Sequence, residues 1–93
     1  MEPREIAARI IDDWIEHGPI EKHLLDNVCY YSAHPAAYFT WAAEDHGYDV
    51  WDDKARKRSI NALIRAEAKR RGLDWNEMKA TVLKATTELL RRN

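Results

Sequence analysis

The sequence has few of the residues and segments that mark several large protein classes. It contains one cysteine, Cys29, with three glycines and three prolines among 93 residues. A single cysteine excludes a disulfide framework within the chain and is typical of a reducing cytoplasm. No apolar run approaches the roughly 20 residues of a membrane-spanning helix, and the first residues do not resemble a signal peptide. We therefore expect a cytoplasmic protein with no membrane partner.

The composition nevertheless supplies enough apolar material for a folded core. Hydrophobic residues make up 45% of the chain and aromatic residues 10%, including four tryptophans and four tyrosines. This content is too high for an intrinsically disordered chain. A length of 93 residues allows one domain and little more, so residues 1–93 are expected to form a single all-helical domain.

Apolar residues recur at helical spacing, and no segment alternates with the two-residue period of a strand. The pattern predicts an all-α protein, a compact bundle of about five helices ending in a long antiparallel αα-hairpin. On the first helix, Ile6, Ile10 and Ile15 are among the residues expected to face the core. The expected helices cover residues 3–17, 19–31, 35–46, 50–71 and 75–91.

Helix-terminating and helix-starting residues support these boundaries. Pro19 suits the first turn of the second helix, and Asp49 offers a capping carboxylate to the fourth. Gly72 is placed to end the fourth helix in a left-handed conformation. Asp74 and Glu77 form an Asp variant of the capping box at the start of the fifth.

The near-zero net charge conceals a strong asymmetry along the chain. Residues 1–53 carry three basic and twelve acidic residues, a net charge of −9, whereas residues 54–93 carry twelve basic and four acidic residues, a net charge of +8. Such a division suggests an interaction with a charged partner. Two interpretations remain open, because the halves can neutralise each other or the basic half can face an external polyanion.

One face of the helix expected over residues 50–71 carries charges of a single sign. At 100° per residue, an arc of roughly 80° holds Lys54, Arg58, Asn61, Arg65 and Lys69, with Lys57 at its border, and no acidic residue interrupts it. A stripe of one sign gives up stabilising ion pairs and builds a positive potential that suits phosphates. The predicted nucleic-acid contacts are Lys54, Lys57, Arg58, Asn61, Arg65 and Lys69. A solvated face, or one docked on the acidic half, is the alternative.

The short turn at Gly72 raises the question of a helix-turn-helix motif. The two flanking helices are longer than the usual pair, and a plain antiparallel hairpin is favoured. In a helix-turn-helix, the residues near a DNA groove would be Asn76, Lys79, Ala80 and Lys84.

Aromatic and acidic residues gather near the middle of the chain. Tyrosine and tryptophan fill cores, but they also dominate the energetic centres of protein interfaces. The acidic residues that follow lack the spacing of a calcium loop, so no metal site is expected. The residues predicted to bind a partner protein are Tyr38, Trp41, Glu44, Asp45 and Asp49.

No pattern of reactive side chains indicates catalysis. The four histidines and Cys29 form no HExxH, CxxC or glycine-rich phosphate motif. We therefore expect neither an enzyme nor a cofactor. The favoured hypothesis is a small regulatory protein that contacts DNA or RNA through residues 54–71. The alternative is a phage- or plasmid-type inhibitor, immunity protein or antitoxin that binds a protein through its acidic and aromatic surface. A homodimer is compatible with both.

Overall fold

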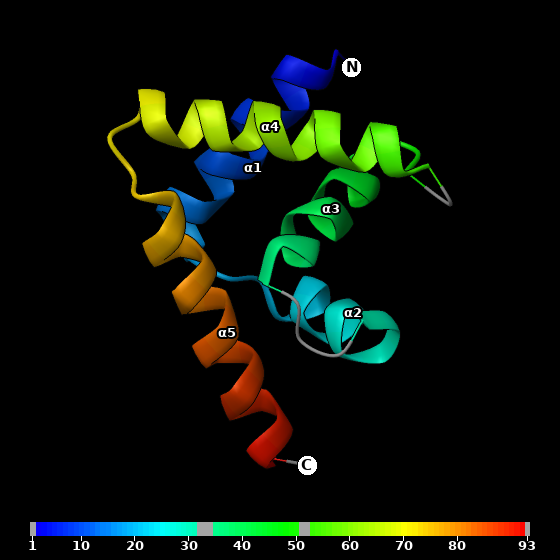
Figure 1. The fold of residues 1–93 in the computed structure, drawn as a ribbon. Coiled ribbons are helices and arrows are strands. Elements are labelled where there is room, and N and C mark those ends of the chain that lie inside the picture. Colours follow the sequence, from blue (N-terminus) through cyan, green and yellow to red (C-terminus); the bar gives the residue numbers. More distant parts are fainter. Residues whose placement is uncertain (1, 32–34, 51–52, 93) are drawn as a thin grey trace.

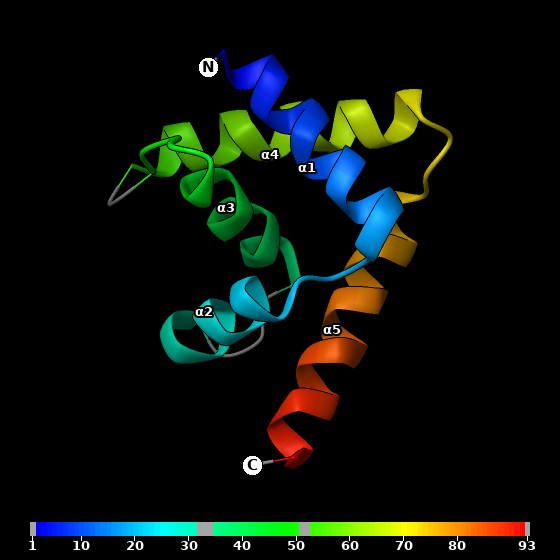
Figure 2. The same cartoon turned by 180° about the vertical axis from the view of Figure 1, so that it is seen from behind.

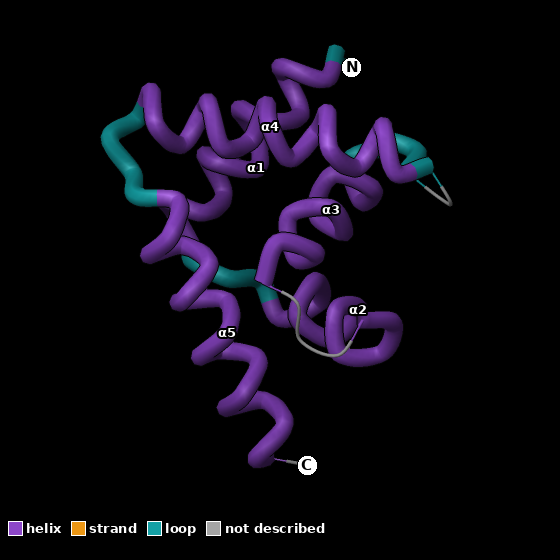
Figure 3. Tube along the Cα trace, in the orientation of Figure 1, coloured by secondary structure: helices purple, strands orange, loops and turns teal. Residues whose placement is uncertain are grey.

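The computed structural model describes residues 2–31, 35–50 and 53–92, with the side chains of residues 27–31 excepted. Over these residues the chain forms five helices and no strand, which confirms the all-α prediction (Figure 3). None of the described helices has the length and apolarity needed to cross a membrane. The helices are α1 (Pro3–His17), α2 (Glu21–Tyr31), α3 (Pro35–Asp45), α4 (Lys54–Arg70) and α5 (Trp75–Arg92).

The first two helices meet at a glycine, and the second begins later than the sequence predicts. Gly18 ends α1 with a φ of 69°, a left-handed conformation that glycine adopts without steric cost. Pro19 was expected in the first turn of the next helix, but α2 begins at Glu21. Ile20, just before α2, is held by a contact with α3, because its amide donates a hydrogen bond of 2.9 Å to the Tyr38 hydroxyl. The prediction for Pro19 was therefore wrong by two residues.

The capping residue of α4 also differs from the prediction. The carboxylate of Asp53 accepts a hydrogen bond of 3.0 Å from the Arg56 amide, which makes Asp53 the N-cap in place of Asp49. The helix therefore begins at Lys54, directly with its basic residues.

The turn between α4 and α5 follows the sequence closely. Gly72 has a φ of 77°, and its amide bonds to the Lys69 carbonyl, while the Leu73 amide reaches back to the Ala68 carbonyl. These two bonds are those of a Schellman motif. The Asp74 carboxylate then accepts from the Glu77 amide at 3.1 Å and caps α5.

Beyond this turn, α4 and α5 do not form the predicted antiparallel hairpin. The two helices leave the turn at a wide angle, and α3 lies inside the corner that they make (Figures 1 and 2). The apolar faces explain this arrangement, since α4 packs chiefly on α1 and α3, and α5 packs on α2 and α3. The sequence shows that each helix has an apolar face, but it does not show which helix covers that face.

The core is centred on Phe39 of α3, which is fully buried. Its ring lies 4.7 Å from the ring of Trp75, 5.0 Å from Tyr38 and 5.5 Å from Trp14, measured between centroids. Rings from α1, α3 and α5 thus form one aromatic cluster. The buried residues of α4 belong to the same hydrophobic core. Ile15 was expected to join the core, but it is 56% exposed because it lies at the end of α1.

Candidate nucleic-acid interface

Helix α4 has one face that is buried and one that is open to solvent. Ile60, Ile64 and Ala68 are fully buried at four-residue intervals and form the face that packs on the rest of the protein. Successive side chains at this spacing share one side of a helix. The opposite side, including Ala62 and Arg65, is exposed.

The exposed side carries a row of basic residues that we call the basic stripe: Lys54, Arg58, Arg65 and Lys69. All four side chains are exposed, and none of them makes an ion pair with any described residue. At a rise of 1.5 Å per residue, the stripe extends over roughly 22 Å along the helix. A row of uncompensated cations of this length creates a strong local positive potential.

Two of the predicted contacts, Lys57 and Asn61, lie at the edge of the buried face and do not belong to the basic stripe. The Asn61 amide group donates hydrogen bonds to the Thr40 hydroxyl at 2.9 Å and to the Lys57 carbonyl at 3.0 Å. Both residues are half-buried. Asn61 is therefore turned toward α3 and bonded within the fold, and its role as a nucleic-acid contact stays a prediction. On a helical wheel it lies only about 20° from Lys54, a difference that the sequence cannot assign to one face or the other.

The acidic half does not cover the basic stripe. Ion pairs between the two halves join Arg71 to Asp12 at 2.6 Å and Arg92 to Glu21 at 3.5 Å. Both involve residues outside the stripe. Among the described residues, the basic stripe thus makes no ion pair with the acidic half, and it remains open to a partner.

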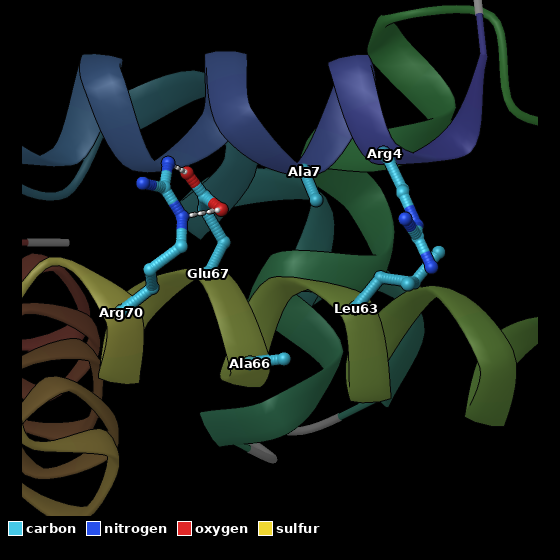
Figure 4. A pocket seen from close by; sticks show the side chains of 6 residues that line it. All are labelled: Arg4, Ala7, Leu63, Ala66, Glu67 and Arg70. Carbon is cyan, nitrogen blue, oxygen red and sulfur yellow. Dashed lines mark hydrogen bonds and ion pairs between the residues drawn. The ribbon is translucent and has the colours of Figure 1, made fainter.

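A shallow groove of about 330 Å³ lies between α1 and α4 (Figure 4). It follows the edge of the exposed side of α4 that is away from the basic stripe. Leu63 and Ala66 line it on α4, and Arg4 reaches into it from α1. Arg70 stands at its other end, ion-paired with Glu67. Arg4 is exposed and makes no ion pair with a described residue. Its place here could not be predicted from the sequence, because Arg4 is far from α4 along the chain and only the packing of α1 brings it there.

A second hollow of about 540 Å³ lies at the corner between α4 and α5. Arg65 and Lys69 of the basic stripe line it with Ala62, Trp75 and Asn76. Asn76, Ala80 and Lys84, which were considered for a helix-turn-helix, are exposed on α5, and Lys79 is half-buried. The two helices therefore offer separate exposed faces on either side of this corner.

The predicted protein-binding residues occupy several different environments. Tyr38 and Trp41 are buried, at 2% and 7% exposure, which confirms their interpretation as core residues and removes them as exposed anchors. Asp45 is ion-paired with Lys22, and this contact holds the pKa of the Asp45 carboxyl below its usual value. Glu44 is half-buried and Asp49 is exposed. These positions do not form one continuous surface with an aromatic centre.

The described histidines have different surroundings. His23 is 4% exposed and packs edge-on against Tyr38, and its burial lowers its pKa. His46 lies 3.6 Å from a carboxylate oxygen of Asp13. Among the residues that the structure describes, no group of three or more potential metal ligands is found. His34 and the Cys29 side chain lie outside the described part.

No family model, curated protein or solved structure matches the chain. Its function must therefore be inferred from the geometry of its own surface. The feature with the clearest chemical preference is the basic stripe, because four exposed cations that make no ion pair with a described residue favour a partner with regularly spaced negative charges.

Proposed function

We propose that this protein is a small, non-catalytic nucleic-acid-binding protein that contacts the phosphate backbone through the basic stripe of α4. The observation that carries the proposal is the exposure of four cations with no ion pair within the described fold. Charges that are not used inside a protein are available to an external partner. A polyanion gains the most from them, since each neutralised phosphate releases condensed counterions.

The rigidity of the stripe supports a backbone contact. Its residues stand on a helix that is anchored by Ile60 and Ile64, so the backbone positions from which the charged side chains project are set before binding. A DNA strand presents one phosphate about every 3.4 Å of helix axis, and a stripe of roughly 22 Å spans several of them. Phosphate contacts of this kind supply affinity and orientation, and they carry little sequence information.

The test is the binding of fluorescent 24-mer DNA and RNA oligonucleotides, measured by anisotropy across a range of salt concentrations. Four phosphate contacts predict a slope of log K against log salt of about −3 to −4. Raising salt from 50 to 200 mM should then weaken binding on the order of 100-fold. The variant R58E/R65E/K69E should lose binding while its helical circular dichroism stays unchanged.

A matched control separates the stripe from general charge. The variant R9E/K84E/R91E changes the net charge by the same amount, at three exposed residues outside α4 that have no ion pair with a described residue. It should keep most of the affinity. Failure of the unmodified protein to bind any oligonucleotide at 50 mM salt would falsify the proposal. Equal losses in the two triple variants would also contradict it, because the interaction would then follow net charge.

A further inference from the structure

The exposed side of α4 has basic residues on both flanks and small residues between them. Between the basic stripe and the α1–α4 groove lie four exposed side chains that we call the α4 ridge: Ala55, Ser59, Ala62 and Ala66. On a helical wheel the ridge fills the arc between the stripe and Arg70. The stripe borders one side of the ridge. On the other side stand Arg70, whose charge is balanced by Glu67, and Arg4, which makes no ion pair with a described residue and supplies the uncompensated charge there (Figure 4).

From this arrangement we infer that the partner is double-stranded DNA and that α4 lies in its major groove, with the α4 ridge toward the base pairs. The inference rests on the proposed function and specifies the form of nucleic acid. Cations on both sides of a helix can reach the two phosphate strands that border a groove. A helix that follows a single strand would need its cations at the centre of its exposed side. In α4 that position is occupied by the α4 ridge.

The dimensions of α4 and of the groove agree. An α-helix with its side chains is about 10–12 Å across, and the major groove of B-form DNA is about 12 Å wide and 8.5 Å deep. Helix α4 has 17 residues and is about 25 Å long. Long side chains on the α4 ridge would hold the backbone of α4 away from the floor of the DNA groove, whereas alanine and serine allow a close approach. The Ser59 hydroxyl is then placed to hydrogen-bond a base edge.

The same features argue against the other forms of nucleic acid. The major groove of A-form RNA is deep and too narrow for protein side chains to read. Single strands are bound mainly by aromatic side chains on which bases stack, and the α4 ridge contains none. Duplex DNA is therefore the nucleic acid that can contact both the flanking cations and the α4 ridge.

A bulky, uncharged substitution on the α4 ridge tests whether α4 lies in the major groove, and it leaves the charge of the protein unchanged. Ala62→Trp should weaken binding to a 24-base-pair DNA duplex at least about tenfold, since the enlarged side chain blocks close approach. The matched control is Ala80→Trp, at an exposed alanine on α5, and it should stay within about twofold of the unmodified protein. Circular dichroism and the thermal midpoint show whether each variant folds.

A footprint on the unmodified protein gives a second measurement that needs no variant. Dimethyl sulfate methylates guanine N7, which lies in the major groove, so bound protein should reduce this methylation. The unmodified protein should also bind duplex DNA more tightly than duplex RNA or a single strand of equal length.

The possible results separate the two proposals. Unchanged N7 reactivity in the saturated complex, or equal affinity of the Ala62→Trp variant, overturns the groove placement while salt-dependent binding leaves the proposed function intact. Tighter binding to duplex RNA or to a single strand overturns it as well. A loss of DNA affinity in Ala80→Trp but not in Ala62→Trp would place α5 instead of α4 in the major groove. Absence of any binding removes the proposed function itself.

Discussion

The two faces of α4 differ in what the fold requires from them. Ile64 is fully buried in the core, whereas its neighbour Arg65 is exposed and makes no ion pair with a described residue. The buried face carries the packing of α4 on α1 and α3, so its residues determine stability. The basic stripe on the exposed face makes no ion pair with a described residue, so its four cations are available to a partner. Stability and binding should therefore be separable by substitutions on neighbouring residues.

The largest expected effect compares these two neighbours directly. Ile64→Ala should lower the free energy of unfolding by about 2–5 kcal/mol, because it removes buried methyl groups and leaves a cavity. Arg65→Ala should change stability by less than about 0.5 kcal/mol, since it is a surface substitution, while reducing affinity for DNA. Urea unfolding and anisotropy measure the two quantities. Similar stability losses in both variants would show that the two faces are not distinct.

A smaller effect is expected at the boundary between the faces. Asn61→Ala should cost about 1–2 kcal/mol of stability, because the buried Thr40 hydroxyl loses its hydrogen-bond donor. Its affinity for DNA should remain within about twofold of the unmodified protein if Asn61 serves the fold. A loss of binding with unchanged stability would instead place Asn61 in the interface, as its position in the sequence pattern suggests.

Acidification should weaken the fold through the buried imidazole of His23. Burial lowers the pKa of His23 below its usual value near 6.5, so the unfolded chain takes up the proton more readily than the folded one. This contribution to stability is complete above pH 6.5 and is lost as the pH falls through that value. Lysine and arginine stay protonated throughout this range.

Urea unfolding between pH 8 and pH 5.5 measures the contribution of His23. The midpoint of the unmodified protein should fall with pH, and His23→Leu should flatten this dependence. Under conditions where the protein remains folded, DNA affinity should change little over the same range. An unaltered pH slope in His23→Leu would mean that other groups control the acid sensitivity.

The sequence predicted the helices well because their signals are local. The bounds of α1 agree with the apolar periodicity, and Gly72 and Asp74 form the turn that their residue types favour. The basic residues of α4 could likewise be placed on one side of a helix from their spacing alone.

Features that depend on packing between helices could not be predicted in this way. The wide angle between α4 and α5 results from which helices cover their apolar faces. The burial of Tyr38 and Trp41 depends on neighbours from other helices, and the same residue types also occur at interfaces. Arg4 reaches the α4 surface only because α1 packs beside that helix.

The central claim is that the unpaired cations of α4 bind nucleic acid, and one comparison tests it most directly. The unmodified protein, R58E/R65E/K69E and R9E/K84E/R91E are titrated with the same DNA duplex at 50, 100 and 200 mM salt. We predict binding with a log–log salt slope of about −3 to −4 for the unmodified protein, near-equal binding by the R9E/K84E/R91E control, and none by the α4 variant. Binding that persists in the α4 variant, or is absent in the unmodified protein, would contradict the claim.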